Sequence, residues 1–390
     1  MSLIMFDRLR MTAGMLSRAY RLGKRYPKRN RLRVMWDYCR LYRKKGLEVA
    51  EYYEFEMERQ PDDFRKSFLG INEQRYYLDY LNSKKYYILA RNKYLSHRAL
   101  EHAGVHKARL FCYYDPEGNY TGSDDMAGDF SSVFAILSRK DVHSCVIKTT
   151  ESSHGDNVFV VRSIEYGSDD AVVTMFDGEV KRLSEIVGEK PLVFEEVVHQ
   201  TDQMAALNAS SVNTVRFMTA LYPDGEARLL AAFIKIGREG RCVDNAGSGG
   251  NVDACVDVET GELKYAIQFN GWRKYSEIER HPDSGCQING MVIQNWGMIK
   301  DRVLDFQRAF PFIKAAGWDI AITDDGPVVI EVNDFWDRTG QLFIRKGWRN
   351  EIRDCYFAWE RTGSKILFGR KLNRLSKDQL EYIIRNEEGC

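Results

Sequence analysis

The segment GWDIAITDDGPVVIEVNDFWD, residues 317–337, carries the clearest pattern in this chain of 390 residues. Two apolar runs, each typical of a β-strand, flank the sequence DDG, which we expect to form a three-residue hairpin loop whose glycine supplies a positive φ. Pairing Thr323 with Pro327 across this loop puts Asp319 directly opposite Glu331. The segment therefore predicts two carboxylates about 5 Å apart on one face of a sheet.

A third polar side chain extends this pair. Asn333 lies two residues beyond Glu331, so it projects to the same face. Two carboxylates and an amide oxygen are the hard oxygen ligands that Mg²⁺ prefers, and water and phosphate oxygens complete its shell. The neighbouring in-face positions, Ala321 and Val329, are apolar, and uncompensated carboxylates are costly to bury. We therefore predict a magnesium site at Asp319, Glu331 and Asn333; the alternative is an exposed hairpin with solvated acids.

A lysine on a predicted strand precedes a loop of small residues in SCVIKTTESSHGDNVFVV, residues 144–161. Lys148 can neutralise a triphosphate, and the small residues Ser153 and Gly155 let backbone amides approach phosphate oxygens. The alternative is an ordinary lysine at a strand edge. The chain has no GxxxxGK[ST] sequence, so this is not a Walker A loop.

A further segment, LVFEEVVHQ at residues 192–200, reads as an apolar strand leading into two glutamates. Backbone amide and carbonyl groups around Glu195, Glu196 and Val198 can hydrogen-bond to the edge of an adenine base. The alternative is that these residues are only the end of a strand.

The residues before about 105 read as helical, because Leu, Met, Tyr and Arg are abundant and prolines are few. Residues 92–105, NKYLSHRALEHAGV, are predicted as one helix that Asn92 caps and Gly104 ends. Residues 291–316 are predicted as another helix from the spacing of their apolar side chains.

From about residue 108 the pattern changes to short apolar runs separated by turn residues, which predicts strands in ARLFCYY, SCVIKTT, NVFVVRS, AVVTMF and PLVFEEVV. Residues 212–236 predict a hairpin through PDGE, and residues 253–266 predict another. The glycine-rich loop NAGSGGN, residues 245–251, lies between them. The tail from 341 onward is predicted to be helical and basic.

The composition is that of an ordinary globular protein, with 44% hydrophobic and 29% charged residues. The formal net charge is +1, so we expect no specific nucleic-acid partner. The eight cysteines include no CxxC pair, which disfavours a zinc knuckle. The N-terminus lacks the apolar run of a signal peptide, and no stretch approaches ~18 apolar residues, so we expect a cytoplasmic protein.

Positive charge is concentrated in residues 1–50, which contain fourteen lysines or arginines and three acidic residues. Two interpretations stay open. The segment is a surface for anionic lipid or an anionic polymer, which would make the protein membrane-peripheral, or it is a solvated helical face balanced by acids elsewhere. Composition by itself slightly favours the second interpretation.

Taken in chain order, these segments resemble the ATP-grasp superfamily over roughly residues 90–340. The order is a helix-borne lysine, Lys93 in RNKYLSH, then the strand lysine Lys148 with its loop, a hinge of the EEVV kind, and an acidic strand paired with an E-x-N strand. Within the superfamily, SSVNTVRFMTAL, IKIGREGRCVDNAGSGG, HPDSG and DIAITDDGPVVIEVN resemble the branch associated with sugar transfer, which is related to the teichuronopeptide-synthesis type.

The resemblance implies an α+β protein with the ATP-grasp fold, in which two α+β subdomains grip ATP, together with a helical N-terminal region. The implied parts are a helical basic region at 1–88, the first subdomain with the phosphate loop at 89–195, the second subdomain with the metal site at 196–340, and a helical C-terminal segment at 341–390.

The resemblance also implies roles for individual residues. Lys93 and Lys148 would contact the ATP phosphates, and the loop with Ser153 and Gly155 would close over them. The adenine would be framed by Glu195, Glu196 and Val198. Either Gln200 or Asp202 would lie nearer the ribose. Asp319, Glu331 and Asn333 would hold one or two magnesium ions. Arg216 and Lys235 lie on intervening strands, and either cation could face the γ-phosphate or an acyl phosphate.

The acceptor side of the site has two candidate regions. Asn245, Gly249 and Gly250 could form an acceptor-binding loop, although a tight turn between strands is the slightly favoured alternative. His281 is a candidate substrate contact, and together with His154 it is a candidate general base for phosphorylation of a hydroxyl.

The implied activity is ATP-dependent ligation of a carboxylate to an amine through an acyl phosphate, with ATP and Mg²⁺ as cofactors and a small molecule or glycan of the cell surface as acceptor. Two alternatives stay open: an ATP-grasp kinase that phosphorylates a sugar hydroxyl, and a non-enzymatic binder of anionic polymer or membrane. The last predicts a steep salt dependence of binding and no ATP turnover. The predicted metal triad argues against it.

Overall fold

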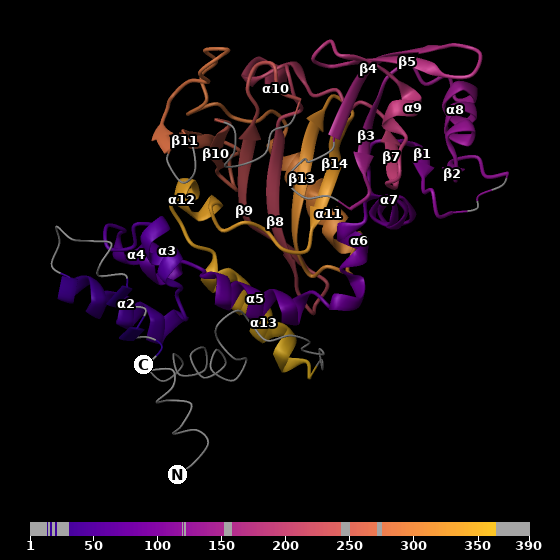
Figure 1. Cartoon of the computed structure of the whole chain (residues 1–390). Helices are drawn as coiled ribbons and strands as arrows, with labels where there is room; N and C mark the ends of the chain where they lie inside the picture. Colours follow the sequence, from indigo (N-terminus) through magenta and orange to yellow (C-terminus); the bar gives the residue numbers. More distant parts are fainter. Residues whose placement is uncertain are drawn as a thin grey trace. The chain divides into compact units, whose positions relative to one another are not determined.

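In the computed structural model, a seven-stranded sheet of the described residues is built outward from the predicted hairpin (Figure 1). The hairpin strands are β13 (Ala315–Thr323) and β14 (Gly326–Asn333). The strands that follow outward from β13 are β8 (Thr214–Leu221), β9 (Ala227–Ile236), β10 (Val252–Val256), β11 (Leu263–Phe269) and β12 (Tyr275–Glu277). The β8–β9 and β10–β11 pairs are antiparallel, which confirms the two other predicted hairpins.

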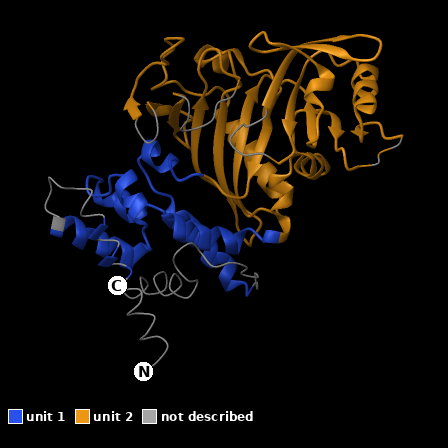
Figure 2. Cartoon of the chain, viewed as in Figure 1, with its two compact units in different colours: residues 1–84, 337–390 blue, residues 85–336 orange. Residues whose placement is uncertain are grey.

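The structure describes residues 14, 16–17, 20–21, 31–118, 120, 122–151, 158–242, 250–270 and 275–363. The chain divides into two compact units, which Figure 2 draws in different colours. Unit 2 is residues 85–336, and unit 1 combines residues 1–84 with residues 337–390. The four-part division drawn from the sequence stays a prediction. None of the helices in the described ranges has the length and hydrophobicity that a membrane span requires.

One face of the hairpin sheet forms a core with helix α11 (Trp296–Ala309), and the other face carries polar residues. On β13, Trp318, Ile320 and Ile322 alternate into this core. Asp319 lies between them and therefore projects to the opposite face. This alternation is the reason why β13, a buried strand between β8 and β14, can present a carboxylate on one side.

The helix predicted over residues 291–316 is wrong at both ends. Helix α11 begins only after Asn295, whose φ of 57° lies outside the right-handed helical region. It ends two residues before Pro311, since a residue that precedes proline is disfavoured in the helical conformation. Residues 315–316 already belong to β13.

The loop of the β13–β14 hairpin is one residue shorter than predicted. Thr323 pairs with Gly326 rather than with Pro327, which leaves a two-residue turn of Asp324 and Asp325. Gly326 has a φ of 106°, so the expected positive φ of this glycine is confirmed. A shift of one residue, if uncorrected, would move every later side chain of β14 to the other face.

A β-bulge in β14 restores the predicted pairing at the acids. The register shifts between Asp319 and Ile320, so that Asp319 still pairs with Glu331. The partner of Ala321 is Val328 rather than Val329. The predicted position of Val329 beside the acids is therefore corrected, because Val329 belongs to the core cluster.

The other sheet of the described residues also has seven strands, and each of the five predicted apolar runs contributes one of them. Its strands, in spatial order, are β2 (Met126–Ala127), β1 (Leu110–Tyr114), β7 (Leu192–Glu195), β3 (Cys145–Thr149), β4 (Val158–Tyr166), β5 (Ala171–Met175) and β6 (Val180–Arg182). Helix α8 (Phe130–Arg139) packs on it through Val133, Ile136 and Leu137, and α9 (Leu183–Ile186) follows β6.

Further helices of unit 2 are α6 (Ile88–Arg91), α7 (Lys93–His102) and α10 (Asp202–Leu207). The predicted helix over residues 92–105 is confirmed as α7. The side chain of Asn92 caps it by accepting a hydrogen bond from the Leu95 amide at 3.0 Å, and Gly104 follows it with a φ of 70°. This cap fixes where Lys93 begins the helix.

Unit 1 is formed by helices α2 (Arg31–Lys45), α3 (Val49–Glu54), α4 (Asp62–Ser67), α5 (Ile71–Leu81), α12 (Gly340–Ile344) and α13 (Arg349–Arg361), and the 3₁₀ helix Lys84–Tyr86 spans its boundary. Buried ion pairs join its two chain segments: Arg349 donates to Glu73 at 2.7–2.9 Å, and Arg338 contacts Glu51. The helical N-terminal region is confirmed for the described residues, and the start of the C-terminal segment completes the same unit.

Candidate functional site

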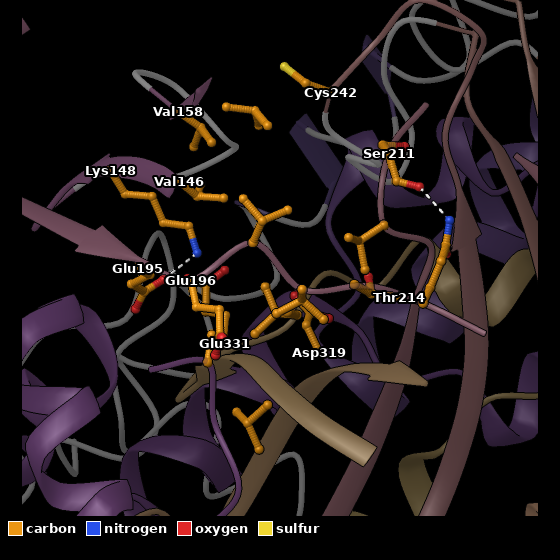
Figure 3. Close-up of a pocket in the computed structure, with 18 of the residues that line it drawn as sticks. Val146, Lys148, Val158, Glu195, Glu196, Ser211, Thr214, Cys242, Asp319 and Glu331 are labelled. Atoms are coloured by element: carbon orange, nitrogen blue, oxygen red, sulfur yellow. Dashed lines mark hydrogen bonds and ion pairs between the residues drawn. The ribbon is translucent and has the colours of Figure 1, made fainter. Parts of the chain in front are cut away.

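A cavity of about 440 Å³ in unit 2 is lined by residues from both sheets (Figure 3). The apolar side chains that line it include Val146, Val158, Val160, Phe176 and Val198. The charged side chains that line it are Lys93, Lys107, Lys148, Lys235, Glu195, Glu196, Asp319 and Glu331. In Figure 3, Val158 and Cys242 lie at one end and Asp319 and Glu331 at the other. The cavity therefore has an apolar end and a charged end.

Glu195 holds two of the lysines. It is the last residue of β7, which lies between β1 and β3. The ammonium of Lys107 lies 2.8 Å from its Oε1, and that of Lys148 on β3 lies 2.6 Å from its Oε2. Burial alone would raise the pKa of Glu195, but the two ammonium groups hold it well below its ordinary value. The carboxylate of Glu195 thus holds the ammonium groups of Lys107 and Lys148 in place at the wall of the cavity.

Lys93 brings a third ammonium group toward the same region. It is the first residue of α7, and its backbone N–H donates to the carbonyl of Thr150, just beyond β3, at 3.0 Å. Burial lowers the pKa of Lys93, and the nearby Lys148 lowers it further, while the charge of Glu331 opposes the shift. This hydrogen bond therefore links the start of α7 to the end of β3, the two elements that carry the predicted phosphate-binding lysines Lys93 and Lys148.

Asp319 is bound by two cations of the hairpin sheet. Arg216, its cross-strand neighbour on β8, donates from Nε to Oδ1 at 2.5 Å and from Nη2 to Oδ2 at 2.9 Å. The Nζ of Lys235 on β9 lies 3.1 Å from Oδ2. Burial alone would raise the pKa of Asp319, but Arg216 and Lys235 lower it to about 2. Both predicted catalytic cations therefore lie beside one predicted metal ligand.

Glu331 differs from Asp319 because it has no such partners. Its side chain is half-buried and lines the cavity, and within the described part of the chain it makes no hydrogen bond or ion pair. The predicted pairing of Asp319 with Glu331 is confirmed by the strand register. Asn333 follows on the same face, where its Nδ2 donates to the carbonyl of Gly317 at 3.3 Å.

The oxygen ligands on this face fit a magnesium ion. A carboxylate accepts about four hydrogen bonds, so the three contacts to Asp319 leave one of its lone pairs open, and Glu331 keeps all of its own. Among the described residues there is no cluster of three or more His, Cys, Asp or Glu that could hold a metal alone. An ion here would complete its shell with water and ligand oxygens, as Mg²⁺ commonly does.

The segment that leaves β7 offers backbone groups to the cavity. Val197, Val198 and His199 line it, and within the described ranges their N–H and C=O groups make no hydrogen bond to other backbone groups. Glu196 is different, because its amide donates to the carbonyl of Arg109 at 2.9 Å. The predicted adenine-framing hinge thus has open donors and acceptors at residues 197–199.

Gln200 and Asp202, the two predicted ribose-side residues, have different environments. The Nε2 of Gln200 donates to the carbonyls of Asn208 and Ser211 at 2.9 and 3.0 Å, and its Oε1 accepts from the amide of Asn213 at 2.9 Å. Gln200 therefore lines the cavity while its side chain holds the loop after α10. Asp202 is an exposed first residue of α10 and does not line the cavity.

The remaining predicted residues divide into those that the structure describes and those that it does not. Ser153, Gly155, Asn245 and Gly249 lie outside the described residues. Gly250 is described, with a φ of 80° and its carbonyl bound to Nη1 of Arg238 at 3.0 Å.

His281 lies outside the set of cavity-lining residues and is buried. Its Nε2 is 2.9 Å from the carbonyl of Gly237, and its Nδ1 is 3.3–3.4 Å from the amides of Ser284 and Asp283. Burial lowers the pKa of His281. The structure therefore uses both ring nitrogens to hold a turn.

Lys107 is the charged cavity residue that the sequence did not indicate. It follows α7 and pairs as an isolated parallel bridge with Val329, which brings it between the two sheets. Its partner Glu195 is 88 residues away. Lys107 stands outside any predicted strand or loop motif, so no spacing pattern pointed to it.

Comparisons with known proteins gave matches among families and solved structures. The search of curated proteins found no relative. Phosphoribosylamine–glycine ligase from Thermotoga maritima is 12% identical with a TM-score of 0.41, and the match covers 77% of this chain and 62% of that one. D-alanine–D-alanine ligase from Bacillus anthracis is 11% identical with a TM-score of 0.35, covering 70% of this chain and 69% of that one. The chain thus spans less than two thirds of the first of these structures.

The family comparison covers more than half of the chain and agrees with the two-sheet α+β architecture. The family described as "Sugar-transfer associated ATP-grasp" matches residues 72–355, which include every charged residue of the cavity. ATP-grasp enzymes are ATP-dependent ligases that use ATP with Mg²⁺. The protein is a member of the sugar-transfer associated ATP-grasp family and has the ATP-grasp fold.

Proposed function

We propose that the protein is a magnesium- and ATP-dependent carboxylate–amine ligase that modifies a sugar acid, an amino acid or a glycan of the cell surface. The single observation that carries this proposal is the cavity that joins the apolar hinge region to the lysine and acid network. The glycan context is supported by the sugar-transfer association of the family.

The charge distribution supports a triphosphate as the ligand. Two carboxylates, Glu195 and Asp319, hold four cations: Lys107, Lys148, Arg216 and Lys235. These two clusters together carry two more positive than negative charges, whereas the whole cavity lining has four lysines and four acids. The positive clusters lie in a partly buried site, where a charge is costly without a counter-charge. A triphosphate carries several negative charges at neutral pH and would supply that counter-charge.

The apolar end supports a flat heteroaromatic base. Val146, Val158, Val160 and Phe176 can cover the faces of a base, and the backbone groups of residues 197–199 can pair with its edge. With the base there, the phosphates would extend toward Lys93 and Lys148. This orientation gives each end of the cavity a matching part of one ligand.

The reaction would proceed in two balanced steps. An oxygen of the substrate carboxylate attacks the γ-phosphorus as the bond from phosphorus to the β-phosphate oxygen breaks, which gives an acyl phosphate and ADP. The amine nitrogen then attacks the acyl carbon, the amide bond forms, and inorganic phosphate and a proton leave. Lys235 and Arg216 would hold charge near the transferring group, and pre-positioned cations of this kind stabilise a transition state without reorganisation.

Magnesium, when bound, would neutralise the negative charge of the phosphates. Glu331, Asp319 and Asn333 would hold it. In this arrangement Arg216 keeps Asp319 ionised and oriented, so the carboxylate is ready to act as a ligand at neutral pH.

The kinase alternative receives less support from the described residues. It requires a base near the γ-phosphate, and His281 is buried outside the cavity with both ring nitrogens engaged. His154 lies outside the described residues.

The test is ADP release from magnesium-ATP with a panel of sugar acids and amino acids, each with and without hydroxylamine. Hydroxamate formed together with ADP is the expected result, because hydroxylamine captures an acyl phosphate. ADP release accompanied by a stable phosphorylated sugar, without hydroxamate, would replace the ligase by the kinase. Absence of nucleotide binding in calorimetry would contradict both.

A further inference from the structure

Helix α2 of unit 1 has a buried face that explains how it packs. Val34, Tyr38, Leu41 and Tyr42 are each at most 5% exposed, and their spacing follows one side of a helix. At the end of the helix Lys45 is also buried, and its ammonium donates to the carbonyl of Phe68 at 3.2 Å. These contacts leave the other side of α2 toward solvent.

The outer face of α2 is defined here by Leu32, Trp36, Arg40, Arg43 and Lys44. These positions follow each other at intervals of four, four, three and one, so they form one stripe. Leu32 is 76% exposed and Trp36 is 66% exposed, while the three basic residues are exposed as well. The guanidinium of Arg40 lies 5.7 Å from the ring centroid of Trp36. Because this stripe includes an exposed Trp and an exposed Leu, it differs from a solvated helix face that contains only charged and polar residues.

The positive charge of this stripe is not cancelled by the helix itself. Asp37 is the single acidic residue of α2. Its carboxylate accepts a hydrogen bond from Tyr52 at 2.8 Å and contacts Arg65, and Arg40 is 3.7 Å away. Asp37 is therefore committed to packing within unit 1, and the outer face combines net positive charge with apolar side chains.

We propose that the outer face of α2 binds the surface of a membrane that contains anionic lipids. Trp36 and Leu32 would enter the headgroup region, where aromatic and aliphatic side chains are favoured, while Arg40, Arg43 and Lys44 meet lipid phosphates. The inference is independent of the ATP chemistry.

A soluble anionic polymer is the other ligand class with matching charge. It would engage the same cations, but it has no apolar phase for Trp36 and Leu32 to enter. Burial of those two side chains is favourable only at a lipid interface or in another apolar contact. The two exposed apolar residues therefore favour the membrane, and they also distinguish the two ligands experimentally.

The first experiment is co-sedimentation of the full chain with vesicles of phosphatidylcholine alone and vesicles that also contain phosphatidylglycerol. We expect binding to the phosphatidylglycerol vesicles that weakens as salt is added, because screening over about 10 Å at 0.1 M reduces surface attraction. Equal partitioning to both kinds of vesicle, or to neither, would overturn the proposal.

Variants of the outer face separate its two components. Each basic residue near an anionic surface strengthens binding about fivefold, so Arg40→Gln, Arg43→Gln and Lys44→Gln together should lower the partition coefficient about a hundredfold. Leu32→Ser with Trp36→Ser should lower it at least about tenfold through lost apolar burial. All five residues are exposed, so the melting temperature should stay unchanged.

A matched control comes from α11, which also presents an exposed apolar residue and exposed arginines. Met298→Ser with Arg302→Gln and Arg308→Gln removes similar groups from unit 2 and should leave vesicle binding unchanged. If this control loses binding as strongly as the α2 variants, attraction is general and not a property of the outer face. Dextran sulfate serves as the polymer probe. The face would be assigned to a polymer if the protein binds dextran sulfate tightly and the Leu32 and Trp36 substitutions weaken neither this binding nor the binding to vesicles.

Insertion of Trp36 can be measured directly. Vesicles with brominated acyl chains should quench part of the tryptophan fluorescence of the wild-type chain, and Trp36→Phe should abolish that part while the other six tryptophans still emit. Equal quenching of wild type and Trp36→Phe would contradict insertion of this side chain.

Discussion

The buried ion pairs of unit 1 and those of the cavity in unit 2 use the same chemical groups in different ratios. In unit 1, Glu73 accepts hydrogen bonds from Arg349 in a bidentate ion pair, and both side chains are at most 5% exposed. In the cavity, Glu195 and Asp319 each hold two cations. The Glu73–Arg349 contact is neutral in itself and joins α5 to α13, whereas each of the two cavity clusters has one more cation than acid.

This difference in the number of cations for each acid distinguishes a charged ligand-binding cavity from a buried ion pair that stabilises the fold. Glu331 strengthens the contrast, because it lines the cavity and finds no partner among the described residues. A partly buried carboxylate that forms no ion pair is costly for the empty protein, and a bound metal ion would offset that cost, so the arrangement indicates binding rather than packing. The predictions below test whether the two kinds of pair separate function from stability.

The largest effect is expected from Glu331→Gln. Loss of this carboxylate removes the open ligand of the proposed metal site, and we expect ATP turnover to fall about a thousandfold or more. The melting temperature should change little, because Glu331 makes no ion pair with other described residues. Asp324→Asn, at the exposed turn of the same hairpin, is the control and should turn over normally. Normal turnover by Glu331→Gln would remove the metal assignment.

The next effect concerns the unit 1 pair. Glu73→Leu removes the buried carboxylate that accepts the hydrogen bonds of Arg349 and should destabilise the protein by about 3–5 kcal/mol in urea unfolding. Adding Arg349→Met should recover a large part of this loss, since the pair is then replaced by apolar packing. ATP affinity of the folded variants should match that of wild type. A loss of affinity comparable to that of the cavity variants would break the distinction between the two regions.

A smaller effect is expected from Lys148→Ala. A charge-assisted contact contributes about 1.5–3 kcal/mol, so ATP affinity measured by calorimetry should fall roughly tenfold to a hundredfold. Glu195 keeps Lys107 at 2.8 Å, so stability should fall less than in Glu73→Leu. Lys181→Ala on β6 of the same sheet is the control. Unchanged ATP affinity in Lys148→Ala would exclude this lysine from the phosphate site.

The smallest effect concerns a one-to-one pair within unit 2. Arg238 binds Asp283 at 2.6 Å and, with backbone hydrogen bonding, lowers the pKa of Asp283 to about 2. A lowered acid pKa stabilises the fold above the ordinary value near 4 and loses that contribution as pH falls toward 2. Asp283 is exposed, so solvent screening reduces the contribution of the pair. Wild type should therefore be more stable than Asp283→Asn by about 1 kcal/mol at pH near 6, and the two should converge near pH 2. A constant difference across that range would show that the pair contributes by packing alone.

Much of the site could be predicted because its patterns are local. Alternation along a strand fixed which side chains accompany Asp319, and the paired hairpin brought Glu331 opposite to it. Even there the prediction succeeded through two compensating errors, a shorter turn and a bulge. Neither feature has a strong local signal, since a two-residue and a three-residue loop can use the same DDG sequence.

The sequence by itself therefore determined the family, the strand-borne Lys148, the capped start of α7 at Lys93 and the Asp319–Glu331 pair. Only the tertiary structure decided that Lys107 joins Lys148 on Glu195, that Arg216 and Lys235 both bind Asp319, and that α13 completes unit 1. The physical reason is range: turns, caps and alternation depend on neighbours within a few residues, whereas these four ion pairs join side chains that are 47 to 103 residues apart. Such partners are chosen by how sheets and helices pack, which no short segment specifies.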